Sequence, residues 1–258
     1  MRFYAELNDH LPPEQRYQTI EKTFYVAPTV KDLIEGCGVP HAEVDLITAN
    51  GESVDFSYIV SNGDRISVYP MFESLDITPE LRVRPKPLRE PAFVLDVHLG
   101  RLAAYLRMLG FDTAYRNCFT DDELVKVSSG EHRILLTRDR GVLKRGAVTH
   151  GYWLRQTDSR LQAAEVVRRF DLARSIQPFT RCMACNGVLE AVSKNQVIGR
   201  LPQRTAELYD DFRQCPQCGR VYWQGSHYVK MQHWIETLKQ PENSPPQRSQ
   251  PEPDGDVH

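Results

Sequence analysis

The chain has 258 residues, of which 41% are hydrophobic and 26% are charged, and its formal net charge is −2. This composition is ordinary for a globular protein, and no apolar run approaches the roughly 20 residues that a membrane-spanning helix needs. The start "MRFYAELNDH" also lacks the apolar stretch of a secretory signal peptide. We therefore expect a cytoplasmic protein without a membrane partner, long enough for one large domain or two to three small ones.

The charge is distributed unevenly along the chain. Residues 1–80 hold 5 Lys+Arg against 14 Asp+Glu, a net −9, whereas residues 81–239 hold 26 against 16, a net +10. A basic body of this size is expected to attract a polyanion, of which nucleic acid is the commonest. The alternative is that two surfaces of opposite sign dock on each other, and charge alone does not choose between the two.

The first segment predicts a β-grasp fold. The stretches "RFYAEL" and "KTFYVAP" are typical of paired strands, and "TVKDLIEGCG" predicts a helix that is capped by Thr29 and ends at Gly36 or Gly38. Asn50-Gly51 between two strand-like runs indicates a hairpin, and "NGDRISVYP" supplies a last strand. Two strands, a helix, a hairpin and a strand are the element order of a β-grasp domain.

The middle segment alternates strands and helices. Continuous apolar strands are expected at 92–95 and in "FDTAYR", "RILLT" and "GYWLR". Between the first two strands, Leu99, Leu102, Leu106 and Leu109 form one apolar helical stripe that ends at Gly110. Strand–helix alternation with continuous apolar strands predicts an α/β domain with a doubly wound parallel sheet.

Acidic residues follow two of these strands directly. Asp96 and Asp139 lie just past strand ends, and doubly wound sheets bind ligands at that edge. Asp121 and Asp122 begin a helix that could reach the same edge. Carboxylates gathered in a basic setting favour a catalytic Mg²⁺ or Mn²⁺ site that hydrolyses phosphodiester bonds. The cations near these acids are candidates to hold RNA phosphates: Arg101, Arg138, Arg140 and Lys144.

Several of the acids could instead serve only the local structure of a helix. Thr120 with Glu123 spells a capping box, and Asp158 precedes a helix as an N-cap. Asp121 and Asp122 could simply stabilise a helix N-terminus. No such local reason is visible for Asp96 or Asp139, so these two carry the prediction.

Two CxxC pairs indicate a metal site in the third segment. Cys182 and Cys185 are separated by 29 residues from Cys215 and Cys218, and four thiolates in two such pairs are typical of a structural Zn²⁺ ion. A redox dithiol or a disulfide pair is the alternative. The long spacer is expected to extend a loop.

Aromatic and basic residues follow the second pair, in "RVYWQGSHY". Tyr222, Trp223 and His227 are candidates to stack on and clamp single-stranded RNA. The alternative is that these aromatic side chains pack a small zinc ribbon.

The motifs "FVLDVHLGRLAAYLRMLGFDTAY", "DDELV" and "RILLTRDRGVL", followed by the two CxxC pairs, resemble the Mut-seven C-terminal ribonuclease family over about residues 92–232. The resemblance implies a PIN-like nuclease domain with its own zinc ribbon. In such nucleases, metals are bound by acids at positions that match Asp96, Asp121 or Asp122, and the Asp139 of a T-x-D turn. Many PIN domains have a fourth acid after a later strand, where this chain offers only Asp158.

The first segment resembles the ubiquitin-like domain that sometimes precedes this family and is related to sulfur carriers. Those carriers act through a C-terminal diglycine, whereas this chain continues through "YPMFES", so sulfur carriage is not expected. A role in docking a protein or ribosomal partner, or in contacting RNA, stays open.

The predicted protein is thus a metal-dependent ribonuclease, and the alternative is a non-catalytic RNA- or ribosome-binding adaptor with the same fold. Its expected parts are a ubiquitin-like β-grasp domain at 1–77, a linker at 78–91, a PIN-like nuclease domain at 92–177, a zinc ribbon at 178–238 and a disordered tail at 239–258.

Overall fold

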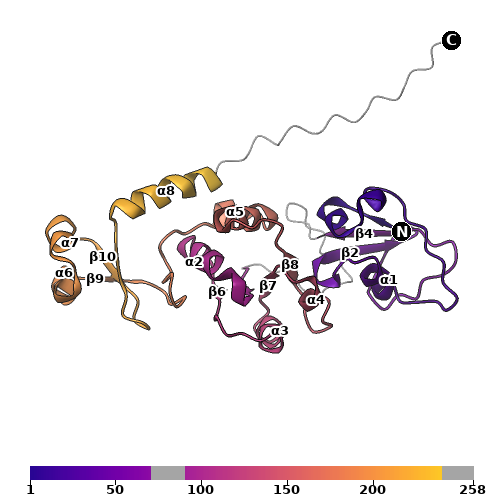
Figure 1. Ribbon diagram of the computed structural model, residues 1–258, viewed down its shortest axis with the longest axis horizontal. Helices are drawn as coiled ribbons and strands as arrows, with labels where there is room; N and C mark the ends of the chain where they lie inside the picture. The colour runs from indigo at the N-terminus through magenta and orange to yellow at the C-terminus, as the bar shows by residue number, and fades with distance from the viewer. Residues whose placement is uncertain (71–90, 240–258) are drawn as a thin grey trace, which may run out of the picture.

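The computed structural model describes residues 1–70 and 91–239, so the predicted linker and tail lie almost entirely outside the described residues. Three parts lie in a row (Figure 1). We call them the head (residues 1–70), the central domain (91–177 together with helix α8) and the cysteine ribbon (178–225). None of the helices in the described ranges is long and apolar enough to cross a membrane.

The head is a mixed sheet of four strands in the order β1-β4-β2-β3, packed on one helix. The predicted helix cap is confirmed, because the Thr29 side chain accepts from the Asp32 backbone N–H. The predicted hairpin is also confirmed, with Asn50 and Gly51 at φ 55° and 92°. The bounds are β1 Arg2–Phe3, α1 Val30–Gly36, β2 Val44–Ala49, β3 Glu52–Val54 and β4 Ile66–Pro70.

Two expectations for the head are wrong. The first strand stops at Phe3, because a 3-10 helix (η1) occupies Ala5–His10. The stretch "KTFYVAP" is a loop, in which Tyr25 and Val26 are 105% and 82% exposed. β-branched and aromatic residues favour a strand only where a neighbour pairs with it, and no strand among the described residues pairs with this loop.

The central domain is a parallel four-stranded sheet in the order β6-β5-β7-β8, as predicted. The chain leaves β5 to one side for β6 and crosses back to β7 on the other, so the strand order reverses between β5 and β7. The bounds are β5 Phe93–Leu95, α2 Gly100–Met108, β6 Thr113–Ala114, α3 Asp121–Gly130, β7 Ile134–Thr137, α4 Arg140–Leu143, β8 Gly151–Trp153 and α5 Ser159–Arg169.

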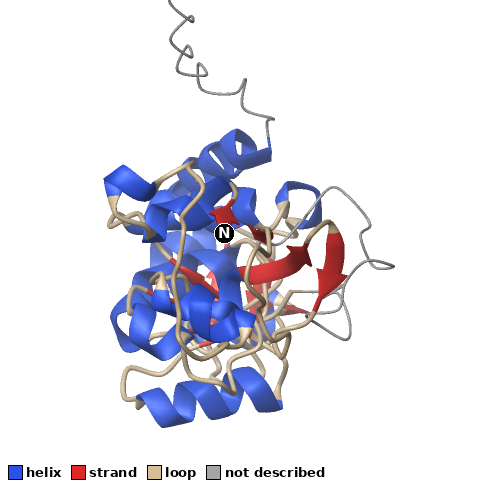
Figure 2. Cartoon of the chain, turned by 90° about the vertical axis from the view of Figure 1, so that its right-hand side faces the viewer, coloured by secondary structure: helices blue, strands red, loops and turns tan. Residues whose placement is uncertain are grey.

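Helices cover both faces of this sheet. On one face, α2 and α5 share a core that includes Leu102, Leu106 and Val166, so the predicted stripe of α2 faces inward. On the other face, Leu124 of α3 and Val142 of α4 pack with Leu135 of β7. Figures 1 and 2 place α8 above the sheet and α3 below it. The α/β class with a parallel sheet is confirmed.

The cysteine ribbon is more structured than predicted. Its antiparallel sheet has the order β11-β10-β9, and the spacer between the CxxC pairs forms helices instead of a plain loop. Helix α8 leaves the ribbon and returns to the central domain, where Ile235 is fully buried and Trp234 lies 5.3 Å from the Tyr105 ring. The bounds are β9 Glu190–Val192, α6 Lys194–Val197, α7 Gln203–Leu208, β10 Phe212–Gln214, β11 Val221–Trp223 and α8 Ser226–Lys239.

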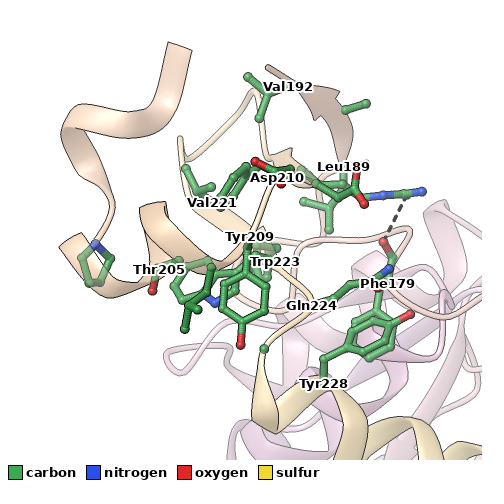
Figure 3. Close-up of a pocket in the computed structure, with 18 of the residues that line it drawn as sticks. Phe179, Leu189, Val192, Thr205, Tyr209, Asp210, Val221, Trp223, Gln224 and Tyr228 are labelled. Atoms are coloured by element: carbon green, nitrogen blue, oxygen red, sulfur yellow. Dashed lines mark hydrogen bonds between the residues drawn. The ribbon is translucent and has the colours of Figure 1, made fainter. Parts of the chain in front are cut away.

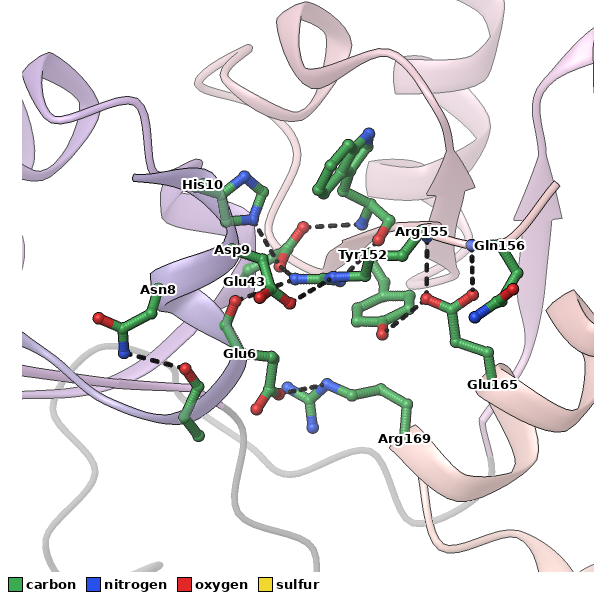
Figure 4. Close-up of polar contacts among 12 residues, drawn as sticks. Glu6, Asn8, Asp9, His10, Glu43, Tyr152, Arg155, Gln156, Glu165 and Arg169 are labelled. Atoms are coloured by element: carbon green, nitrogen blue, oxygen red, sulfur yellow. Dashed lines mark hydrogen bonds and ion pairs between the residues drawn. The ribbon is translucent and has the colours of Figure 1, made fainter. Parts of the chain in front are cut away.

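A buried carboxylate joins the head to the central domain (Figure 4). Glu43, which ends the 3-10 helix η3 (His41–Glu43), accepts a hydrogen bond of 2.7 Å from the backbone N–H of Trp153 in β8. Its other oxygen lies 3.0 Å from His10 Nε2, a contact that requires the proton on that nitrogen, and 3.4 Å from Arg155. Burial disfavours the charge on Glu43, but His10, Arg155 and the Trp153 N–H together lower its pKa below the usual 4.5.

Two more ion pairs cross the same interface. Arg155 also pairs with Asp9 at 3.1 Å, and Arg169 of α5 pairs with Glu6 at 2.8 Å. On the central domain side, Glu165 fixes the loop that carries Arg155 by accepting from its backbone N–H at 2.9 Å. The head is therefore held by a charged network in which Arg155 is the central cation.

We predict that Glu43→Gln lowers the free energy of unfolding by about 3 kcal/mol, because the substitution leaves Arg155 without its buried counter-charge. Urea unfolding followed by circular dichroism measures the change. Glu52→Gln, on the exposed start of β3, is the control and is expected to stay within about 0.5 kcal/mol. Equal stabilities of the two variants would contradict the role of Glu43.

The same carboxylate predicts a loss of stability in acid. Because the pKa of Glu43 in the folded chain lies below its usual 4.5, its contribution is complete at neutral pH and is lost as the pH falls through the folded value. We expect Glu43→Gln to flatten the dependence of unfolding free energy on pH below about 4.5, and parallel curves for the variant and the parent would contradict this.

Candidate active site and metal centre

Asp96 and Asp139 come together at the carboxyl edge of the parallel sheet, where the strand order reverses. The buried hydroxyl of Thr137 donates to Asp96 Oδ2 at 2.8 Å and accepts from the backbone N–H of Asp139 at 2.9 Å. Asp96 begins the 3-10 helix η5 (Val97–Leu99), but its side chain makes no capping hydrogen bond there. One hydroxyl thus ties the two strand ends to each other.

Asp139 has a local role that the sequence pattern did not reveal. Its side chain caps α4 by accepting from the Gly141 backbone N–H at 2.7 Å, so helix capping accounts for an acid at this position. The carboxylate is exposed, and its second oxygen has no hydrogen-bond partner among the described residues. Capping therefore occupies one oxygen and leaves the other available to a ligand.

Asp121 and Asp122 begin α3, and a cation already lies against them. Arg145 forms an ion pair with Asp122 and lies 3.8 Å from Asp121. The predicted capping box of Thr120 and Glu123 is present. Within the described residues, the carboxylates do not form a group of three or more that could hold a metal ion, so Asp121 and Asp122 are not gathered into one metal site with Asp96 and Asp139.

The candidate phosphate-binding cations fall into two pairs. Arg101 and Arg138 are exposed, and their side chains have no partner among the described residues. Lys144, by contrast, donates to the Glu35 carbonyl at 3.1 Å. Arg140 lies 4.4 Å from the centre of the Trp153 ring. Arg140 also donates to the backbone carbonyl of His10 in the head. Lys144 and Arg140 therefore both contact the head.

The four cysteines of the CxxC pairs form the group that could hold a metal ion. All their Sγ atoms lie within 4.8 Å of one another. Burial opposes ionisation of Cys182, but hydrogen bonds from Tyr222 and from backbone N–H groups lower its pKa to about 6. Burial and the neighbouring Cys215 raise the pKa of Cys185 to about 12. Cys185 thus resists ionising beside Cys182 unless a cation neutralises the pair, and four cysteine sulfur atoms at this spacing fit a tetrahedral Zn²⁺ ion.

Backbone turns hold the cysteines in place. The Cys182 N–H donates to the Gly187 carbonyl at 2.7 Å, and the Cys215 N–H donates to the Arg220 carbonyl at 2.9 Å. Gly187 leaves no room for a side chain, because a Cβ atom there would lie 2.9 Å from the Cys215 Sγ. The close approach of the backbone to the sulfur atoms therefore accounts for the glycine after the first pair.

The ribbon docks on the edge strand β6 through residues that sequence reasoning missed. The Asn186 side chain accepts from the Thr113 backbone N–H at 3.0 Å and donates to Asp112 at 2.9 Å. Burial opposes ionisation of Asp112, but Arg133 at 2.6 Å and Asn186 lower its pKa. Arg107 of α2 reaches the carbonyls of Met183 and Ala184. In the sequence, the only indication of a role for Asn186 was its position directly after a CxxC pair.

The structure also locates the aromatic candidates. Tyr222 is half-buried, and its hydroxyl lies 3.1 Å from Cys182 Sγ, which fits the packing alternative for this residue. Trp223 lies further along β11 and is only partly buried. The side chain of His227 lies outside what the structure describes.

We predict that Cys215→Ser abolishes tight zinc binding, because the buried hydroxyl replaces one of four thiolate ligands. Zinc released by acid treatment of the purified protein is measured with a colorimetric chelator. Cys118→Ser removes an exposed thiol outside the cluster and is expected to retain about one zinc ion per chain. Full zinc content in the Cys215 variant would contradict the assignment.

Comparison with known proteins agrees with this architecture. The family model of the Mut7-C RNAse domain matches residues 91–235, and that of Mut7-C ubiquitin matches residues 1–76. Neither the search of curated proteins nor that of solved structures gave a match. The resemblance predicted from the sequence is confirmed. Because the first match covers more than half of the chain, we conclude that the chain belongs to the Mut7-C RNAse domain family, with a Mut7-C ubiquitin-like domain ahead of the RNAse domain.

Proposed function

We propose that the protein is a divalent-metal-dependent ribonuclease that hydrolyses RNA phosphodiester bonds beside Asp96 and Asp139. The observation that carries this proposal is that the Thr137 hydroxyl links the Asp96 carboxylate to the backbone N–H of Asp139 at the reversal point of a parallel sheet. That edge is where doubly wound sheets bind their ligands. The match to an RNAse family makes RNA the expected substrate, and a PIN-like arrangement of the acids is part of the proposal.

Mg²⁺ or Mn²⁺ suits this site, because such ions are often held by only one or two carboxylates together with water and substrate phosphates. When bound, the ion would polarise the scissile phosphoryl group and favour deprotonation of the attacking water. Asp96 and Asp139 would hold it through their free oxygens. Asp121 and Asp122 would contribute as further catalytic acids only if Arg145 moved to a substrate phosphate.

The residues around the acids would position the RNA. The exposed guanidinium groups of Arg101 and Arg138 can each donate two hydrogen bonds to a phosphate. Thr137 keeps the Asp96 carboxylate oriented by donating to one oxygen, which leaves the other toward the ligand. Arg140 and Lys144 would contact RNA only at the boundary with the head, where both already have partners.

The second candidate function is a non-catalytic RNA- or ribosome-binding adaptor. The ion pairs of Arg145 with Asp121 and Asp122 favour it, because they leave the site with two free carboxylates. In that function the head would hold a protein or ribosomal partner. The two candidates differ in whether Mn²⁺ binds and whether RNA is cut.

We predict that Asp139→Asn lowers the rate of RNA cleavage by about 10²-fold, the scale of removing one group that stabilises charge in the transition state. Asparagine caps helices as well as aspartate, so α4 should remain intact and the loss should reflect the charge. Cleavage of a 5′-labelled RNA in Mn²⁺ is followed on a denaturing gel.

Asp158→Asn is the matched control, because Asp158 caps α5 just as Asp139 caps α4 but does not contact Thr137. It is expected to cleave at the parent rate. If the parent protein binds RNA but neither cuts it nor binds Mn²⁺ in calorimetry, the ribonuclease proposal fails and the adaptor remains.

A further inference from the structure

An open cavity of about 1320 Å³ lies between the sheet of the cysteine ribbon, helix α7 and the start of α8 (Figure 3). We call it the aromatic groove. Small-molecule pockets have volumes of about 300–1,000 Å³, so this one is large enough for a segment of a polymer. No residue of the carboxylate site lines it. The groove is therefore separate from the carboxylate site, and its lining residues indicate what it could bind.

Six aromatic residues line the groove, and four of them form two adjacent pairs. Phe179 and Tyr228 lie 4.4 Å apart between ring centroids, with their planes at 34°. Tyr209 and Trp223 are also adjacent, since a Cβ atom built on Gly225 would lie 3.8 Å from the Tyr209 hydroxyl and 3.1 Å from Trp223 Nε1. Figure 3 shows both pairs facing the cavity. Flat aromatic surfaces at this density suit planar ligands that stack.

The polar atoms of the groove are free to bind a ligand. Among the described residues, the indole N–H of Trp223 and the hydroxyls of Tyr209 and Tyr228 have no hydrogen-bond partner. Arg204 and Arg213 are exposed on the lining and form no ion pair with any described acid. Arg213 only donates to the Phe179 carbonyl at 3.4 Å. Asp210 and Asp211 also line the groove, and Asp210 already pairs with Lys194 at 2.9 Å. An apolar peptide would leave the free donors and the two arginines unmatched, whereas nucleobases would match the donors and phosphates would match Arg204 and Arg213.

The groove lies at the opposite end of the sheet from Asp96 and Asp139. The ribbon attaches to the turn between α2 and β6, where the Phe179 N–H donates to the Met108 carbonyl. This turn precedes β6 and so marks the amino ends of the parallel strands, whereas both acids follow carboxyl ends. A polymer bound in the groove would have to extend along the central domain to reach Asp96 and Asp139.

We propose that the aromatic groove binds the stacked bases of single-stranded RNA, with Arg204 and Arg213 on its phosphates, at a distance from the carboxylate site. This deepens the proposed function and rests on RNA being the substrate. It locates the binding of single-stranded RNA in one groove and adds Phe179, Tyr209, Arg204 and Arg213 to the binding residues expected from the sequence. A duplex is excluded because its bases already stack on each other.

The test uses the full-length chain with its zinc, in an Asp139→Asn background that slows cleavage by about 10²-fold and in buffer without added Mg²⁺ or Mn²⁺. An oligouridylate of about 10 nucleotides with a fluorescent label is titrated by anisotropy. Tyr209→Ala and Trp223→Ala are each expected to raise the Kd by about 10-fold, the scale of losing one base–aromatic stack. A 2-aminopurine base in the same oligonucleotide should lose fluorescence on binding to the parent and keep it in these variants.

Tyr25→Ala, which removes an exposed tyrosine of the head, is the matched control and should leave the Kd unchanged. Unchanged zinc content shows that the variants are folded, and Trp223→Phe should restore most of the affinity. An unchanged Kd in both groove variants, an equal loss in the Tyr25 control, or no binding of the oligouridylate by the parent would overturn the proposal. Cleavage at the parent rate in Asp139→Asn would instead overturn the proposed function and leave this binding result standing.

Discussion

The edges of the parallel sheet govern how the three parts of the chain assemble. An edge strand exposes backbone N–H groups that need acceptors. At the β6 edge, the Thr113 N–H donates to the side chain of Asn186 from the ribbon. At the β8 edge, the Trp153 N–H donates to Glu43 from the head. Each neighbouring part thus accepts a hydrogen bond from one edge strand of this four-stranded sheet.

Part of the uneven charge of the chain is neutralised by ion pairs between the head and the central domain. Arg155 and Arg169 pair with acids of the head, so docking between the head and the central domain accounts for part of the charge asymmetry. The head removes these cations from the surface available to RNA. Arg101 and Arg138 remain exposed, so in the proposed function they would be available to an RNA phosphate.

Local signals explain what the sequence could predict. The Asn50-Gly51 turn and the leucine stripe of α2 depend on neighbours within a few residues, and both were right. The contacts of Glu43 with Trp153 and of Asn186 with Thr113 join residues more than 70 positions apart, and no local pattern specifies them. Helix α8 is different, because Met231, Trp234, Ile235 and Leu238 repeat at helical spacing and could have shown that it packs on a core.

The carboxylates and the aromatic groove lie at opposite ends of the sheet, so in the proposed function RNA would be bound at one end and cut at the other. In the proposed function, residues at the carboxyl ends of β5 and β7 would affect the cleavage step, while residues of the ribbon would contact RNA only at the amino end of the sheet. Groove variants should therefore alter KM for long single strands while leaving the cleavage step intact, because uniform binding energy lowers KM without changing kcat. An RNA too short to reach from the groove to the carboxylates would lose the binding energy of the groove entirely. The length of the RNA, and not only its sequence, would therefore determine how well it is cut.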